Sequence, residues 1–160
     1  MNIIFDFDGV IINSHKIKTN AFHEVFKDYG NNVAKKSKKY HEKNIGKSRY
    51  LKFKYIIKNI LKKKVNKKEI LSLDRKFDLF VERKIKKMQI TKYLLHFLKQ
   101  NNKVINLYIS TGTPQNKIIK ILKEKKIFNF FKKIYGSPAS KITHINRIKK
   151  KNNKILFIGD

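Results

Sequence analysis

The chain opens with an apolar run that ends in two closely spaced acids, Ile3-Ile4-Phe5-Asp6-Phe7-Asp8-Gly9-Val10. Such a run is typical of a buried parallel strand that delivers carboxylates to its C-terminal edge, where open α/β sheets bind ligands. On an extended backbone Asp6 and Asp8 face the same side, and Gly9 permits a sharp turn after them. Like charges at this spacing repel unless a cation lies between them. A hard cation with oxygen ligands, such as Mg²⁺, fits this pattern.

The same acidic motif also occurs in ordinary turns and in calcium loops, so by itself it leaves those alternatives open. The second half of the chain favours the sheet. Three apolar runs that predict strands alternate there with two helical patterns, one of which starts with Thr113 as the cap and Pro114 as the first helical residue. Alternation of this kind predicts right-handed crossovers and a parallel sheet. The predicted later strands are Val104–Ile109, Ile134–Tyr135 and Ile155–Ile158.

Between the first and second predicted strands, the apolar residues from Ser14 to Gln89 recur at helical spacing. Asn66 and Glu69 have the spacing of a capping box at the start of a long helix. We therefore predict an α/β fold with an all-helical insertion after the first strand. The predicted domains are a discontinuous core of residues 1–13 and 92–160 and a helical domain of residues 14–91.

Each predicted strand ends in polar residues. Ser110-Thr111-Gly112-Thr113 follows the second strand, Gly136-Ser137-Pro138-Ala139-Ser140-Lys141 follows the third, and the fourth ends at Gly159-Asp160. Carboxyl ends of parallel strands meet at one edge of a sheet, so these groups are expected near Asp6.

With four such motifs in this order, the chain resembles the haloacid dehalogenase superfamily, in the branch of phosphoglycolate phosphatase and beta-phosphoglucomutase. The resemblance implies a Rossmann-like parallel sheet with a helical cap inserted after the first strand. In the family a second acid lies a few residues beyond the position of Asp160, where this sequence stops. The expected sheet is therefore C-terminally incomplete.

The resemblance also implies roles for single residues. Asp6 is the expected nucleophile and Asp8 the general acid and base. Ser110 is expected to hold the transferring phosphoryl group together with Thr111 and Gly112, and Lys141 to neutralise it, with Lys132 and Lys133 as weaker rivals. Mg²⁺ is the implied cofactor, with the Asp6 carboxylate, the Asp8 backbone carbonyl and Asp160 as its ligands.

The segment Gly46-Lys47-Ser48-Arg49 resembles the cap loop that contacts substrate in beta-phosphoglucomutase-like proteins. An arginine fork suits a second phosphate or carboxylate group of a substrate, so Ser48 and Arg49 are predicted to bind substrate. The alternative is a surface arginine in a loop at a helix start. The expected function is a Mg²⁺-dependent phosphatase of a small phosphorylated metabolite, such as a sugar phosphate or phosphoglycolate. A phosphomutase and a truncated, inactive remnant that binds polyanions non-specifically are the alternatives.

The formal net charge of +29 raises the possibility of nucleic-acid binding. However, only four of the 40 basic residues are arginines, and the lysines are spread along every segment. We therefore expect no specific nucleic-acid partner, although a positive field concentrates anionic substrates. The sequence has no cysteine, signal-peptide pattern or long apolar stretch, so we expect a cytoplasmic protein without a membrane partner, as a monomer or weak dimer.

Overall fold

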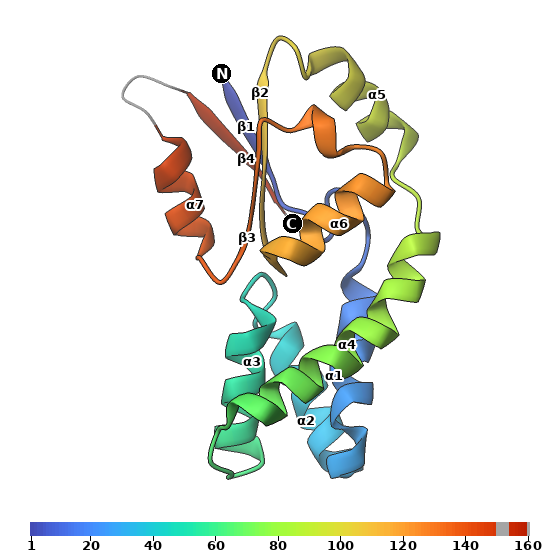
Figure 1. Cartoon of the computed structure of the whole chain (residues 1–160), viewed down its shortest axis with the longest axis vertical. Helices are drawn as coiled ribbons and strands as arrows, with labels where there is room; N and C mark the ends of the chain where they lie inside the picture. Colours follow the sequence, from blue (N-terminus) through green and yellow to red (C-terminus); the bar gives the residue numbers. More distant parts are fainter. Residues whose placement is uncertain (150–153, 160) are drawn as a thin grey trace. The chain divides into compact units, whose positions relative to one another are not determined.

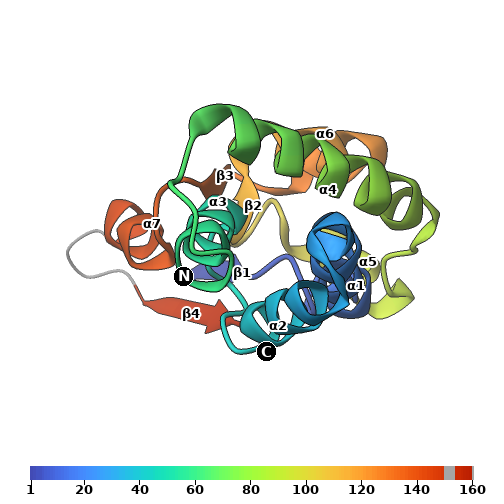
Figure 2. The ribbon, with the colours of Figure 1, turned by 90° about the horizontal axis from the view of Figure 1, so that it is seen from below.

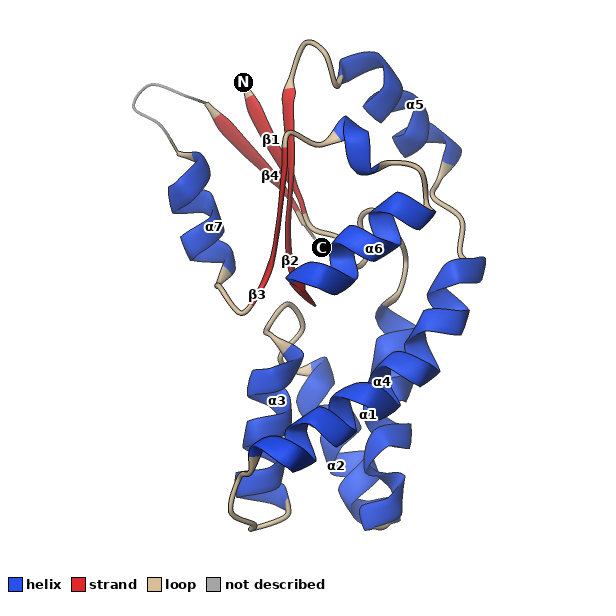
Figure 3. Ribbon diagram, in the orientation of Figure 1, coloured by secondary structure: helices blue, strands red, loops and turns tan. Residues whose placement is uncertain are grey.

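The structure, a computed structural model, describes residues 1–149 and 154–159 of the chain (Figure 1). The chain divides into two compact units, which we call unit 1, Met1–Asn13 with Met88–Asp160, and unit 2, Ser14–Lys87. Unit 1 contains the strands, and the regular structure of unit 2 is helical (Figure 3).

Unit 1 is built on a parallel sheet in the order β3-β2-β1-β4. Ile4 and Phe5 of β1 are fully buried, as expected for a strand covered on both faces. The predicted α/β fold with a parallel sheet is confirmed. The strands are β1 (Asn2–Phe5), β2 (Asn106–Pro114), β3 (Lys133–Ser137) and β4 (Ile155–Ile158).

Helices cover both faces of this sheet (Figures 1 and 2). Phe5 contacts the rings of Phe97 and Phe131 on one face, whereas Ile4 packs near Ile148 of α7 on the other. The chain runs outward from β1 to β3 and then returns to the other side of β1, so right-handed crossovers place α7 opposite α5 and α6. Such a reversal next to β1 is where open α/β sheets bind ligands. The elements outside the sheet are α5 (Lys92–Asn101), α6 (Gln115–Glu124), η3 (Phe128–Phe130) and α7 (Lys141–Ile148).

The prediction for the ends of the second strand was wrong. Val104 is 84% exposed, because the backbone amides of Val104 and Ile105 both bond to the carbonyl of Asn101 and close the preceding helix. At the other end, Thr113 and Pro114 belong to β2, and α6 begins only at Gln115. A residue that precedes proline is sterically driven to extended backbone, which keeps Thr113 in the strand.

Unit 2 is a group of helices around a cluster of aromatic rings. Phe22 contacts Phe53 and Phe77, and Phe26 contacts Phe53, through ring pairs with centroids 5.3–6.0 Å apart. The predicted cap at Asn66 is confirmed, since its side chain accepts a 2.8 Å hydrogen bond from the amide of Glu69. No helix in the described part of the chain is both long and apolar enough to cross a membrane. The elements are α1 (His15–Phe26), η1 (Lys27–Tyr29), α2 (Asn31–Glu42), α3 (Arg49–Tyr55), η2 (Ile56–Ile60) and α4 (Lys67–Lys87).

Gly136 of β3 has no room for a side chain. A Cβ atom there would lie 2.6 Å from the carbonyl oxygen of Thr113 and 2.7 Å from the Cα atom of Gln115. Both contacts are with backbone, so they are relieved only by separating β3 from the end of β2. We expect Gly136→Ala to lower the free energy of unfolding by about 2 kcal/mol, measured by urea denaturation. Ile142→Ala, at a 71% exposed position of α7, serves as the control and should leave the urea midpoint unchanged. Equal midpoints for Gly136→Ala and wild type would contradict the predicted clash.

Candidate active site

Two acids lie where β1 ends. The Asp6 side chain is buried, with the residue only 4% exposed, and its Oδ1 atom accepts a 2.7 Å hydrogen bond from the amide of Phe7. Asp8 is half-buried, and Gly9 follows it at a φ of 84°, a conformation that glycine adopts without strain. The turn closes through a hydrogen bond from the Ile11 amide to the Phe7 carbonyl. The backbone therefore leaves the sheet directly after presenting both carboxylates.

Lys141 pairs with Asp6 across 135 positions of sequence, its ammonium donating to Asp6 Oδ2. Lys141 is the first residue of α7, and Ser140 caps that helix by accepting a 3.1 Å hydrogen bond from the Thr143 amide. Burial raises the pKa of Asp6, the hydrogen bond and charge of Lys141 lower it, and the charge of Asp8 raises it. The site therefore places a nucleophile candidate beside one cation and a second carboxyl group.

The rival lysines lie elsewhere in unit 1. Lys133 is the first residue of β3 and so belongs to the amino end of that strand, whereas Asp6 follows the carboxyl end of β1. Lys132 directly precedes Lys133, and its ammonium donates a 3.1 Å hydrogen bond to the Asn106 side chain. Among these three lysines, Lys141 is the one that the described structure pairs with Asp6.

Ser110 and Thr111 lie beside β1, because Phe5 pairs in parallel with Ile109 and the next residues along are Asp6 and Ser110. The Ser110 hydroxyl is completely buried and lies 2.9 Å from Nδ1 of His144.

The Thr111 hydroxyl is buried as well and accepts a 3.2 Å hydrogen bond from the Thr113 amide. Gly112 lies between Thr111 and Thr113 in the same strand. The structure thus brings Asp6, Asp8, the Ser110 segment and Lys141 to one edge of the sheet.

Sequence reasoning missed His144. This residue is 1% exposed and lies on the same helix as Lys141, three positions further on. Residues three apart in a helix lie on the same face, so the Lys-x-x-His spacing was the available signal. His144 is one of five histidines in the chain, however, and no motif distinguished it from the other four.

Asp160, the third predicted metal ligand, lies outside the described residues. Within the described residues, no group of three histidine, cysteine or acidic side chains is placed to hold a metal ion. Asp6 and Asp8 nevertheless lie close enough for the charge of Asp8 to raise the pKa of Asp6. The Asp6 carboxylate and the backbone carbonyl of Asp8 supply oxygen donors that fit Mg²⁺, which proteins often bind through one or two carboxylates and the phosphate of a substrate.

Ser48 and Arg49 belong to unit 2, at the start of α3. The Arg49 side chain is buried and engaged within the unit, with Nε 2.7 Å from Asp74 Oδ1 and Nη1 2.8 Å from Asp78 Oδ1. Its guanidinium also lies 4.9 Å from the centroid of the Phe77 ring. The hydroxyl of Ser48 is buried without a hydrogen bond to the described residues. A role of either residue in binding substrate stays a prediction, and the contacts seen here give Arg49 a structural role.

Removing the Arg49 charge is therefore expected to destabilise the protein. In Arg49→Met the partly buried carboxylates of Asp74 and Asp78 lose their shared cation, and we expect the free energy of unfolding to fall by about 2–3 kcal/mol in urea. Lys76→Met is the matched control, because the Lys76–Asp28 pair is exposed and screened by solvent, so its loss should shift the urea midpoint much less. If both variants unfold at the wild-type urea concentration, the ion pairs do not stabilise unit 2.

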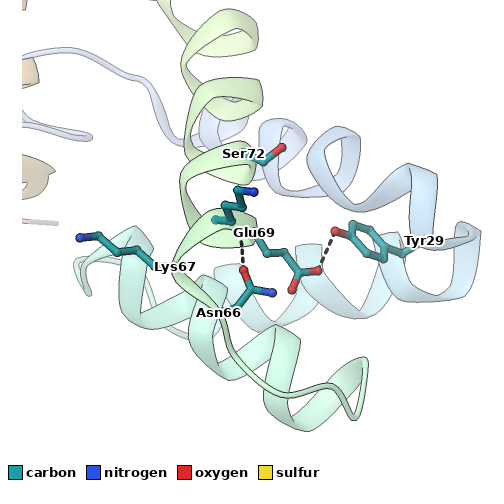
Figure 4. Close-up of a pocket in the computed structure, with 6 residues that line it drawn as sticks. Tyr29, Asn66, Lys67, Glu69 and Ser72 are labelled. Carbon is teal, nitrogen blue, oxygen red and sulfur yellow. Dashed lines mark hydrogen bonds between the residues drawn. The ribbon is translucent and has the colours of Figure 1, made fainter.

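A surface hollow of about 700 Å³ in unit 2 lies where η1 meets the start of α4 (Figure 4). The Tyr29 hydroxyl donates a 2.9 Å hydrogen bond to Glu69, the residue whose amide is capped by Asn66. Burial and the neighbouring Glu69 raise the pKa of Tyr29 to about 12, so this phenol stays protonated at neutral pH. These contacts join the two elements, and we assign the hollow no chemistry.

The comparisons with known proteins agree with this arrangement. The family described as haloacid dehalogenase-like hydrolase matches residues 3–160. No curated protein matches the chain.

Several solved structures share the fold. An enzyme of Haemophilus somnus, predicted to be a phosphoglycolate phosphatase, is 16% identical, with a TM-score of 0.68 over 99% of this chain and 76% of the other. The protein YfnB of Bacillus subtilis, assigned by prediction as a HAD-hydrolase and bound to magnesium, is 19% identical, with a TM-score of 0.66 over 99% and 79%. A beta-phosphoglucomutase of Clostridium difficile is 23% identical, with a TM-score of 0.64 over 96% and 64%. At these identities the likeness concerns the fold.

Proposed function

Because this chain belongs to the haloacid dehalogenase-like hydrolases, we propose that it is a Mg²⁺-dependent phosphatase of a small phosphorylated metabolite. The observation that carries this proposal is the ion pair between Lys141 and the buried Asp6 at the carboxyl edge of the sheet. A carboxylate nucleophile beside a fixed cation is suited to attack a phosphoryl group, whose negative charge would otherwise repel it.

In the proposed reaction, a carboxylate oxygen of Asp6 attacks phosphorus while the bond from phosphorus to the ester oxygen breaks. Asp8 gives its proton to the departing oxygen, which leaves as an alcohol. Asp8 then takes a proton from water, and the water oxygen attacks the aspartyl phosphate. Inorganic phosphate leaves, the Asp6 carboxylate is restored and Asp8 is protonated again. Each group thus ends the cycle in its starting state.

The remaining residues act by charge and position. Phosphoryl transfer is catalysed mostly by placing the groups correctly and by stabilising charge on the three equatorial oxygens. Lys141 would supply a positive charge there, and Ser110 a hydroxyl. When bound, Mg²⁺ would be held by the Asp6 carboxylate, the Asp8 backbone carbonyl and Asp160, and it would neutralise charge on the phosphoryl oxygens.

For the substrate we propose a sugar phosphate or a phosphoglycolate-type ester, with unit 2 as the specificity-determining cap. The names of the Haemophilus and Clostridium proteins support this class of substrate. The net charge of +29 would also raise the local concentration of phosphorylated anions. A phosphomutase shares the same core chemistry and differs in that the phosphoryl group is returned to the product instead of to water.

The test is release of inorganic phosphate from a panel of sugar phosphates and phosphoglycolate by the 160-residue chain. Reactions contain Mg²⁺ or a chelator, and isomerisation of each sugar phosphate is followed in parallel by NMR. Phosphate release that requires Mg²⁺ supports the phosphatase. Isomerisation without release would replace it with the mutase, and the absence of both from the folded chain would overturn the proposal.

A further inference from the structure

We propose that His144 is a positioning residue that holds the Ser110 hydroxyl in place for contact with the phosphoryl group. The inference deepens the proposed function and rests on it. It assigns a task to a buried histidine that takes no part in the reaction described above.

The hydrogen bond between the two side chains is enclosed. Ser110 is fully buried, His144 is 1% exposed, and the Ser110 oxygen lies 2.9 Å from Nδ1 of the ring. A buried hydroxyl can rotate, so its hydrogen points wherever a partner directs it. His144 is the partner that the described structure gives to Ser110.

The two ring nitrogens of His144 lie in different surroundings. Nδ1 lies 2.9 Å from the Ser110 oxygen, and Nε2 is buried. The backbone of Gly136 in β3 also forms a hydrogen bond with the ring. Contacts with both β2 and β3 therefore hold the ring that fixes the Ser110 hydroxyl.

The ring is also kept neutral. Burial lowers the pKa of His144, and the charges of Arg147 and Lys141 lower it further, although the hydrogen bond with the Gly136 backbone raises it. A neutral ring adds no second cation that would compete with Lys141 for Asp6. Its function in the site is therefore one of orientation.

His144 also links the two halves of the site mechanically. It lies three positions after Lys141 on α7, stacks on Tyr135 of β3 with ring centroids 5.3 Å apart, and bonds to Ser110 of β2. Movement of α7 relative to β2 would break that bond. The Ser110 hydroxyl and the Lys141 ammonium are thereby held in a fixed relation, which catalysis by preorganised groups requires.

The experiment compares His144→Leu with His144→Asn, each alone and combined with Ser110→Ala. Leucine keeps an apolar side chain but no hydrogen bond, whereas an asparagine amide can place its nitrogen near the position of Nδ1. Two quantities are measured in the 160-residue chain with Mg²⁺. One is the kcat and KM for p-nitrophenyl phosphate, and the other is the Kd for inorganic phosphate by calorimetry. Urea unfolding gives the folded fraction used to correct both.

We expect His144→Leu to lower kcat about tenfold and to weaken phosphate binding, and His144→Asn to restore most of both. In the Ser110→Ala background, His144→Leu should have no further effect on kcat. The inference would be overturned if His144→Leu lowered kcat equally with and without the Ser110 hydroxyl, or if His144→Leu kept full activity. Either result would leave the proposed phosphatase function standing. If wild type binds phosphate but releases none, the proposed function fails. Weaker phosphate binding by the single variant His144→Leu than by wild type would still support the positioning role. If wild type neither binds nor releases phosphate, both proposals fall.

Discussion

Asp6→Asn should abolish Mg²⁺-dependent phosphate release, with kcat at least about 10⁴-fold lower, as for loss of a nucleophile in other covalent mechanisms. The amide has nearly the same shape as the carboxylate, but it cannot form the aspartyl phosphate. The fold should persist, because the amide oxygen of the new side chain can still accept the hydrogen bond that the Phe7 amide donates to Asp6. The measurement is phosphate release together with circular dichroism and urea unfolding of the same sample.

Glu124→Gln is the matched control for Asp6→Asn. It removes the same charge from an exposed position at the end of α6 and should leave kcat within about twofold of wild type. If Asp6→Asn kept metal-dependent turnover while Glu124→Gln behaved as wild type, Asp6 would not be the nucleophile.

Lys141→Gln should have the second largest effect, lowering kcat by about 10²–10³-fold. The ammonium that donates to Asp6 Oδ2 is lost, and the phosphoryl oxygens lose a positive charge. The pH dependence should change as well. Burial already raises the pKa of Asp6, and Lys141 lowers it, so removing Lys141 raises that pKa further. Since protonated Asp6 cannot attack, the acid limb of kcat/KM should move to higher pH.

Lys132→Gln is the control, because Lys132 bonds to the Asn106 side chain and not to Asp6. It should keep the wild-type kcat and pH profile. A Lys141→Gln variant whose acid limb stays in place would show that Lys141 does not set the ionisation of Asp6.

Much of unit 1 could be predicted from local patterns. The apolar run before Asp6 and the alternation of strands and helices indicated a parallel sheet, because a strand buried on both faces must be apolar throughout. The order of polar residues at the strand ends then predicted which groups lie near Asp6. The Lys141–Asp6 ion pair agrees with that prediction, although the two residues lie 135 positions apart.

What the sequence determined, therefore, is the class of fold and the edge of the sheet at which the polar residues gather, because hydrophobic periodicity and strand order depend on residues near one another in the chain. Only the tertiary structure decided which partner each side chain takes. Arg49 pairs with Asp74 and Asp78, and Ser110 with His144, because packing of distant segments determines which charged and polar groups become buried together. A buried polar group must find a partner wherever the fold supplies one, and spacing along the chain does not specify that partner.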